Sequence, residues 1–492
     1  MIENRKLKID NCKSVFAFVL GREQKIARAE LESVLRRFCF NFYSDKNYPE
    51  PCRGMDSANL SLAGNVVLIN IERVEEFLKN DIISLLGGTM EIYQIIGIAD
   101  NIDPDIIYSK ISKLSEGHEG RVTFGVSDYS KSFTVDKINT LGLDVKKKLK
   151  ENFSARFVAL RDDSTLSAAA IISNRLHKDG ILLGIFSNHG QYLTGKLIGV
   201  FNPNEWSRRD FDKPRSDKIS GMTPPKLARM IVNIALGKST KHEARSTKQI
   251  QNFKKENSKH VSDFGFRISD FQDVVLLDPF CGSGNILIEA AVLGCKIIGS
   301  DISEKAVNNT RANLNWLDQN FQFPISNFQS NFNDQISNSE SYKLFQADAT
   351  KFDFAPVLTN KLTPKKLRSY VIVTEPYLGQ PKKFKPTKNA VRGEYTKVKK
   401  LYLEFLKNVS GIMYNVSGIT IIFPLVETME GVRYSLFDES IDEIKKMGYT
   451  LTDGPFVYGR DYQVVKREIV LLKITKNKSQ NTNKLQIQNT KS

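Results

Sequence analysis

The residues whose types and spacing best suit chemistry form a short loop, residues 278–284, with the sequence Asp-Pro-Phe-Cys-Gly-Ser-Gly. The apolar run 274–277 before it is typical of a buried parallel strand, and residues 285–291 after it are typical of a helix start. Gly282 and Gly284 permit a tight turn, and the backbone N–H groups of a helix start bind carboxylates. Two glycines without a following Lys-Ser or Lys-Thr exclude the three-glycine dinucleotide loop and the P-loop. The loop therefore predicts a site for the methionine carboxylate of S-adenosylmethionine.

The next two predicted strands also end in acidic residues. Residues 296–300 lead into Asp301, which lies 23 positions after Asp278 and is placed to accept hydrogen bonds from both ribose hydroxyls. The simpler interpretation is that Asp301 only caps a helix that starts near Ser303. Asp348 ends a third strand and could accept from the adenine amino group, although aspartate is also common in surface turns. Three acids at the ends of three successive strands favour the cofactor interpretation.

A fourth predicted strand, residues 369–373, leads into Thr374-Glu375-Pro376-Tyr377. Methylation of an exocyclic amine needs acceptors aimed at its N–H groups and an aromatic face that holds the extruded base. Enzymes of this type usually carry Asp or Asn, then two prolines and an aromatic residue, so Thr374 takes the acidic place and Glu375 that of the first proline. Either Thr374 and a backbone carbonyl accept the bonds, or Glu375 supplies the carboxylate from one position later. A plain strand-to-turn ending is the remaining alternative.

A basic segment, residues 382–400, follows this motif directly and contains eight basic residues, one acid and two aromatics. Such a composition suits a loop that tracks a phosphate backbone beside an active site, and the formal net charge of +16 favours a polyanionic partner. Solvated charge without a partner is the alternative. The candidate RNA-binding residues are Lys382, Lys383, Lys385, Lys388 and Arg392.

The periodicity of the chain predicts an α/β protein with four parts. Residues 1–100 alternate strands and helices, among them a helix at about 74–86, in an order that suits a small ferredoxin-like α+β module. Residues 101–205 form a second α/β module without a catalytic constellation, so binding is its expected role. Residues 206–475 alternate strand and helix and predict a mostly parallel sheet with helices on both faces. Residues 476–492 are a basic, polar tail that we expect to be disordered.

Composition sets further limits. An apolar fraction of 41% and an aromatic fraction of 10% describe a globular protein. The longest apolar runs are much shorter than the roughly 20 residues of a membrane helix, and the start lacks an apolar secretory signal. Five scattered cysteines and five dispersed histidines argue against disulfides and a structural metal. We therefore predict a cytoplasmic protein with no membrane segment and no metal.

Four stretches of the chain together resemble the THUMP-domain tRNA guanine-N2 methyltransferases, which include the archaeal and eukaryotic enzymes for the guanine at tRNA position ten. The resemblance covers residues 14 to about 475, and residues 208–228 are much more specific than the opening stretch. Residues 278–289 are a further part. The other two parts are residues 20–31 and the closing segment 460–469. This chain has Asn285 at a position where that family usually has Thr or Ser.

The resemblance implies an N-terminal ferredoxin-like domain and a THUMP domain that together hold the tRNA acceptor end. It also implies a Rossmann-like catalytic domain that binds S-adenosylmethionine and methylates N2 of guanine. The motif 374–377 would take the base. The cofactor contacts would be Asp278, Pro279, Phe280, Gly282, Gly284, Asp301 and Asp348.

Two other functions stay open at this point. One is a methyltransferase of the same build that acts on ribosomal RNA, at guanine N2 or adenine N6. The other is a non-catalytic RNA-binding protein with a degenerate motif. A C5 pyrimidine enzyme is disfavoured because it needs a cysteine near the target motif, and Cys295 is the last cysteine in the sequence. The sequence does not report the number of methyl groups added or an accessory subunit.

Overall fold

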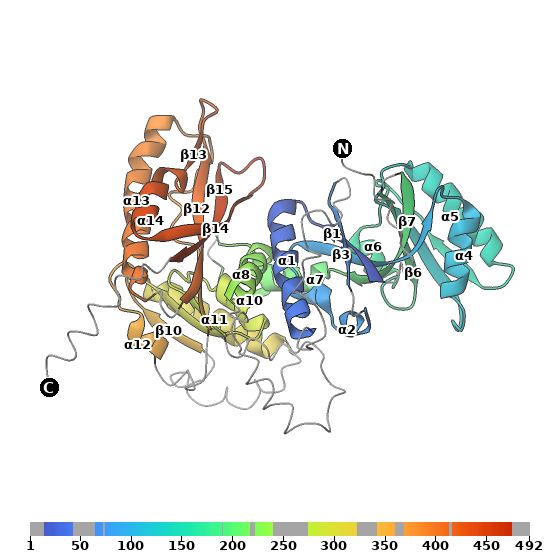
Figure 1. The fold of residues 1–492 in the computed structure, drawn as a ribbon, viewed down its shortest axis with the longest axis horizontal. Helices are drawn as coiled ribbons and strands as arrows, with labels where there is room; N and C mark the ends of the chain where they lie inside the picture. Colours follow the sequence, from blue (N-terminus) through green and yellow to red (C-terminus); the bar gives the residue numbers. More distant parts are fainter. Residues whose placement is uncertain are drawn as a thin grey trace, which may run out of the picture. The chain divides into compact units, whose positions relative to one another are not determined.

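The computed structural model describes residues 14–42, 64–71, 74–188, 190–216, 222–239, 274–321, 342–359, 369–412 and 416–474. These residues form two compact units, one up to Asp210 and one from Phe211 onward. Each unit is built around one sheet (Figure 1). The predicted tail, residues 476–492, lies outside the described residues.

The first unit contains a seven-stranded sheet in the order β2-β1-β3-β7-β6-β4-β5. Strands β3 and β7 pair antiparallel and join the part before residue 100 to the part after it. The two predicted α+β modules therefore share one continuous sheet. The strands are β1 Val15–Leu20, β2 Val66–Asn70, β3 Thr89–Ala99, β4 Val122–Asp128, β5 Ala155–Val158, β6 Ile181–Asn188 and β7 Gln191–Val200.

Helices α4, α5, α6 and α7 of the first unit begin at side chains that cap them. Asp103 accepts from Ile106 N at 2.9 Å, and Thr134 accepts from Lys137 N at 3.3 Å. The two helices that they start, α4 and α5, lie side by side (Figure 1). The single helix predicted at about 74–86 is two short helices, because Asn80 and Asp81 favour a turn between them. The helices are α1 Gln24–Phe42, α2 Val74–Leu78, α3 Ile82–Leu85, α4 Pro104–Leu114, α5 Val135–Leu149, α6 Ala168–Ser173 and α7 Pro203–Ser207.

The second unit contains an eight-stranded sheet in the order β10-β9-β8-β11-β12-β15-β14, with β13 paired to β12. Strands β10, β9, β8, β11 and β12 are parallel, whereas β15 is antiparallel to both of its neighbours. The predicted mostly parallel sheet is thus confirmed. The strands are β8 Val274–Asp278, β9 Lys296–Asp301, β10 Tyr342–Gln346, β11 Ser369–Thr374, β12 Val416–Glu427, β13 Arg433–Ser435, β14 Tyr449–Tyr458 and β15 Val465–Ile474.

Helices cover both faces of this sheet, because alternate residues of its strands are buried on opposite sides. Val275 and Leu277 pack into one core with Phe405 of α13, and α14 lies beside α13 over β14 (Figure 1). Helix α8 contacts α10, β11 and β12. The helices are α8 Pro225–Ser239, α10 Asn285–Val292, α11 Glu304–Asn320, α12 Ala355–Thr359, α13 Lys388–Ser410 and α14 Ile441–Lys446. A buried apolar stripe on α8 consists of Leu227, Met230, Ile231 and Ile234.

The basic segment 382–400 is not the continuous loop that its composition suggested. From Lys388 onward it forms the first turns of α13. Thr387 caps this helix by accepting from Ala390 N at 3.3 Å. Val391 and Tyr395 lie one turn apart and are fully buried, so an apolar stripe under the charges decides for a helix. Among the helices in the described ranges, none is long and apolar enough to cross a membrane.

Candidate active site

The predicted strand-end residues meet at one edge of the second sheet. Strands β8, β9 and β11 end at Asp278, Asp301 and Thr374, and the three strands run parallel. Asp348 lies two residues beyond the end of β10, which pairs in parallel with β9. Parallel strands place their carboxyl ends at the same edge, where α/β folds bind ligands. The structure therefore brings together all four elements on which the cofactor and base predictions depend.

The loop after β8 has the backbone that its glycines were expected to allow. Gly282 and Gly284 have φ values of 53° and 86°, in the left-handed region. A side chain on Gly284 would meet Thr310, because an added Cβ would lie 2.8 Å from its Cγ2 atom. Thr310 also donates its hydroxyl to the Gly282 carbonyl at 2.9 Å. The N-cap residue of α10 is Gly284, which has no side chain to accept from the first-turn N–H groups.

Asp301 is tied to this loop. Its Oδ2 atom accepts from Gly282 N at 3.0 Å, and its Oδ1 atom accepts from Ser303 N at 2.9 Å. The side-chain cap of α11 is Ser303, whose hydroxyl accepts from Ala306 N at 3.4 Å. Each carboxylate oxygen of Asp301 accepts one bond here and has the capacity for a second.

Asp348 lies in a turn of its own. Its Oδ1 atom accepts from Thr350 N at 3.0 Å and from Thr350 Oγ1 at 2.7 Å, and its Oδ2 atom lies 3.1 Å from Lys351 Nζ. The hydrogen bond from the Thr350 hydroxyl is the main reason that the pKa of Asp348 is lowered. The local bonds are those of a surface turn, and a role toward adenine stays a prediction.

Asp278 is buried at the centre of the edge. Its Oδ1 atom accepts from Thr374 Oγ1 at 2.6 Å and from Phe280 N at 3.2 Å. Burial raises the pKa of Asp278 to about 7, and the neighbouring charges of Asp301 and Glu375 act in the same direction. Thr374 is itself 0% exposed. The hydroxyl of Thr374 therefore points to Asp278 inside the protein.

Glu375 is held by side chains from two other segments. Its Oε1 atom accepts from Arg467 Nε of β15 at 2.6 Å, and its Oε2 atom accepts from the hydroxyl of Thr223 just before α8. Arg467 also donates to the Met222 carbonyl at 3.2 Å. Sequence reasoning did not give Thr223 or Arg467 a role. Both residues lie in stretches that carried the family resemblance, Thr223 in 208–228 and Arg467 in 460–469, and this was the one signal available.

The rest of the motif is fixed by α13. Pro376 is buried, whereas Tyr377 is 47% exposed. Tyr395 of α13 donates its hydroxyl to the Leu378 carbonyl at 3.3 Å, and Glu394 accepts from Gln380 N at 2.5 Å. The loop after Tyr377 is thus hydrogen-bonded to α13, and the Tyr377 side chain stays accessible to a base.

The five candidate RNA-binding residues fall into two groups. Lys382 pairs with Glu394, and Lys385 lies 2.8 Å from Glu427. The other three are exposed, and Phe384, in the same loop, is 84% exposed. Exposed cations beside an exposed aromatic ring suit single-stranded or extruded nucleotides. These three are Lys383, Lys388 and Arg392, and Lys385 is exposed as well despite its pairing with Glu427.

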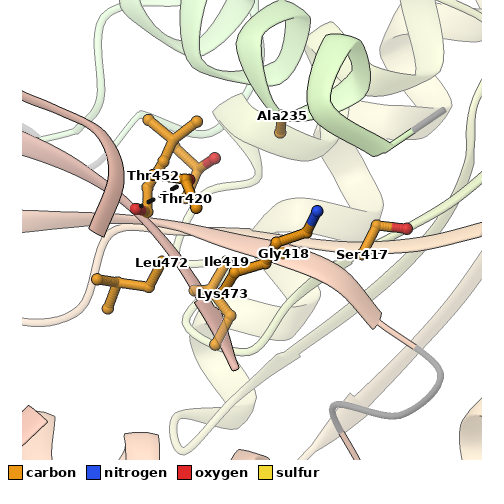
Figure 2. A pocket seen from close by; sticks show the side chains of 9 residues that line it. Ala235, Ser417, Gly418, Ile419, Thr420, Thr452, Leu472 and Lys473 are labelled. Carbon is orange, nitrogen blue, oxygen red and sulfur yellow. Dashed lines mark hydrogen bonds between the residues drawn. The ribbon is translucent and has the colours of Figure 1, made fainter. Parts of the chain in front are cut away.

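A small hollow lies elsewhere on the second unit, lined in part by Ser417, Gly418 and Lys473 (Figure 2). Thr452 donates its hydroxyl to the Leu471 carbonyl at 3.2 Å beside it. Ser417 is near the amino end of β12, whereas the candidate site follows the carboxyl ends of the parallel strands. The hollow is therefore separate from the candidate active site.

Residues 270–409 match a family model described as "Methyltransferase domain". The match includes strands β8, β9, β10 and β11, whose carboxyl ends carry the candidate cofactor and base residues. The chain is 23% identical over 277 residues to the tRNA (guanine(10)-N2)-dimethyltransferase of Pyrococcus abyssi. The matched region covers 54% of this chain and 70% of that protein. It is 60% identical over 40 residues to the probable tRNA (guanine(10)-N2)-dimethyltransferase of Methanothermococcus thermolithotrophicus, covering 8% of this chain and 25% of that protein.

A further relative, the tRNA (guanine(10)-N2)-dimethyltransferase of Methanothermobacter thermautotrophicus, is 54% identical over 39 residues, which are 8% of this chain and 12% of that protein. The matches to these last two relatives thus span a quarter or less of their lengths. The crystal structure of TrmN from Thermus thermophilus is 13% identical with a TM-score of 0.41, covering 94% of this chain and 99% of that one.

Proposed function

We propose that this chain is an S-adenosylmethionine-dependent methyltransferase that transfers methyl to the exocyclic N2 of a guanine in tRNA, of the position-ten type. The observation that carries the proposal is the meeting of Asp278, Asp301 and the motif 374–377 at one sheet edge of a methyltransferase domain. The names of the curated relatives supply the substrate.

The cofactor would be held by the loop after β8. Its methionine carboxylate fits the start of α10, where Gly284 leaves the first-turn N–H groups without a side-chain cap and an added Cβ at Gly282 would meet nothing within 4 Å. Asp301 has acceptor capacity left for the ribose hydroxyls, and Asp348 is the candidate acceptor for the adenine amine. When bound, the cofactor supplies an electrophilic methyl group on a sulfonium. Pro279 and Phe280 shape the turn between Asp278 and these contacts.

The base would be held against Tyr377, whose accessible ring is suited to stacking. The motif beside it carries the acceptors that the exocyclic amine needs. Transfer is then a direct in-line displacement in which the N2 lone pair attacks the methyl carbon. The protein orients the two partners, excludes water and forms no covalent bond with either of them.

The RNA would be held by the first unit and by the loop at 382–387 together with the start of α13. We assign the ferredoxin-like and THUMP parts to the first unit, whose sheet is continuous through β3 and β7. Lys383, Lys388 and Arg392 are exposed next to the base motif and suit phosphates. The binding should therefore weaken as the salt concentration rises.

The experiment that tests the proposal measures methyl incorporation from labelled cofactor into purified tRNA and ribosomal RNA, followed by mass spectrometry of the nucleosides. We expect N2-methylated guanosine in tRNA. Label only in ribosomal RNA, or N6-methyladenosine, would contradict the substrate. Binding of tRNA and cofactor with no transfer would show a non-catalytic RNA-binding protein instead.

A further inference from the structure

Of the two side chains that could accept from the target amine, the structure favours Glu375. Thr374 donates its hydroxyl to Asp278 at 2.6 Å and is 0% exposed, so it is turned away from any ligand. The side chain of Glu375 is 8% exposed and precedes the accessible Tyr377 by two residues. Of the two side chains, that of Glu375 is therefore the one that keeps some exposure and makes no bond to Asp278.

The bonds to Glu375 fix its orientation and leave it acceptor capacity. Arg467 binds one oxygen through Nε at 2.6 Å, and the Thr223 hydroxyl binds the other. The side chain of Arg467 is 9% exposed, so the pair is charge-assisted and largely desolvated. Each carboxylate oxygen can accept two hydrogen bonds, and each has one bond here. The remaining acceptor positions suit the two N–H groups of an exocyclic amine.

The support for Glu375 continues to the cofactor loop. Asn285, the first residue of α10, donates Nδ2 to the Thr223 carbonyl at 2.6 Å. Lys213, which is 4% exposed, donates Nζ to Asn285 Oδ1 at 2.6 Å. A line of hydrogen bonds thus runs from Lys213 through Asn285 and Thr223 to Glu375 and Arg467. Asn285 makes two of these bonds, one as a donor and one as an acceptor.

We propose that Glu375 accepts from the exocyclic amine of the target base, and that Arg467 and Thr223 are positioning residues that hold its carboxylate. This inference rests on the proposed function. In the step, the amine nitrogen forms a bond to the methyl carbon while the carbon–sulfur bond breaks and its electron pair goes to sulfur. One proton of the nitrogen leaves through the carboxylate of Glu375 to water.

The test compares kcat and KM of Arg467→Gln, Thr223→Val and Glu375→Gln with those of the full-length wild type. We expect kcat to fall roughly 100-fold or more for Glu375→Gln, because a positioned acceptor is lost. It should fall roughly 10- to 100-fold for Arg467→Gln and roughly 10-fold for Thr223→Val, because the acceptor is misplaced. The KM values for tRNA and cofactor should stay within about threefold.

Two matched variants at the other end of the sheet control for loss of a cation and of a hydroxyl. Lys473→Gln and Thr452→Val lie beside the hollow in Figure 2 and should keep the wild-type kcat. Arg467→Lys should recover part of the loss, because it restores the cation without the geometry of Nε. The double variant Glu375→Gln with Arg467→Gln should be no slower than Glu375→Gln alone, since both act through one carboxylate.

An unchanged kcat in Arg467→Gln, shown to be folded by circular dichroism, would overturn the positioning role. Additive losses in the double variant would do the same. If wild type methylates guanine N2 but Glu375→Gln is as fast, this inference fails while the proposed function stands. If wild type methylates another exocyclic amine and the variants still lose kcat, the substrate is wrong but the role of Glu375 holds.

Discussion

Two buried arginine–glutamate pairs in the second unit differ in where they lie. Arg229 of α8 and Glu289 of α10 are 2.7 Å apart between Nη2 and Oε2, with side chains 1% and 0% exposed. Arg467 and Glu375 are 2.6 Å apart, with side chains 9% and 8% exposed, at the edge where strands β8, β9 and β11 end. The first pair joins two helices, whereas in the second Glu375 precedes the accessible Tyr377 by two residues. Burial of an ion pair therefore does not by itself indicate an active site. The position of the pair relative to the carboxyl ends of the parallel strands distinguishes the two cases.

The physical difference is the access of a ligand to the carboxylate. Glu289 is enclosed by the helices that it joins, so its bonds contribute to packing. Glu375 also accepts from Thr223, whose segment is bound to the start of α10 through Asn285. Both carboxylates have an arginine because an unpaired charge in either place would be costly. One pair stabilises the fold, and the other holds an acceptor at the site.

The largest expected effect is a loss of stability when the Arg229–Glu289 pair is broken. Glu289→Gln should lower the free energy of unfolding by about 3–5 kcal/mol, because it removes the negative charge that pairs with the buried Arg229 guanidinium. Urea unfolding followed by circular dichroism measures the change. The folded fraction should methylate at a rate within about threefold of wild type. A folded but inactive Glu289→Gln enzyme would mean that the Arg229–Glu289 pair also serves catalysis, and the two pairs would then not differ in role.

Asp278 sharpens the comparison because its bonds come from a hydroxyl and a backbone amide rather than an arginine. Its pKa in the folded state, about 7, lies above the ordinary aspartate value of 3.8, so the native state retains a proton that the unfolded state releases. The carboxyl therefore destabilises the fold progressively as the pH rises from about 4 to 7, and fully above that. Asp278→Asn removes this penalty.

The stability difference between Asp278→Asn and wild type should thus move in favour of asparagine between pH 5 and pH 8, by an amount on the order of 2–4 kcal/mol. Urea unfolding at several pH values measures it. Glu404→Gln, at an exposed position of α13, is the control for loss of one negative charge. A difference that does not depend on pH would show that Asp278 is ionised throughout.

A smaller effect is expected at the ring beside the second pair. Tyr377→Ala should reduce kcat/KM for tRNA roughly 10-fold, since stacking of one base is worth about 1–3 kcal/mol. Tyr462→Ala, which removes a 73% exposed tyrosine from the turn between β14 and β15, should change kcat/KM little. Equal losses in both variants would mean that Tyr377 does not hold the base.

The elements and the glycine loop could be predicted from the sequence because their signals are local. Apolar runs gave the strands, and Gly282 and Gly284 gave the turn with positive φ. The basic segment was mistaken for a loop because charge dominates its composition, although Val391 and Tyr395 already had helical spacing. Periodicity was the better guide there, since burial of one face decides between a helix and a loop.

The partners of the site residues could not be predicted from local patterns. Thr374 bonds a carboxylate 96 residues away, and Glu375 bonds partners 92 and 152 residues away. Such pairs are set by the order of the strands in the sheet, which brings β15 next to β12 and Arg467 to the carboxyl edge. The sequence left Thr374 and Glu375 as alternatives for the acceptor, and the direction of the Thr374 hydroxyl separates them.

The smallest expected effect concerns the helix that anchors the base motif. Gly393 lies in α13, and a Cβ added to it would meet nothing within 4 Å. Gly393→Ala should therefore raise the free energy of unfolding by about 0.5–1 kcal/mol, because alanine loses less backbone entropy in a helix. Neither arginine–glutamate pair is touched, so kcat should not change. A fall in kcat together with the gain in stability would show that catalysis depends on motion of α13, and the site would then be more than the fixed pair at Glu375.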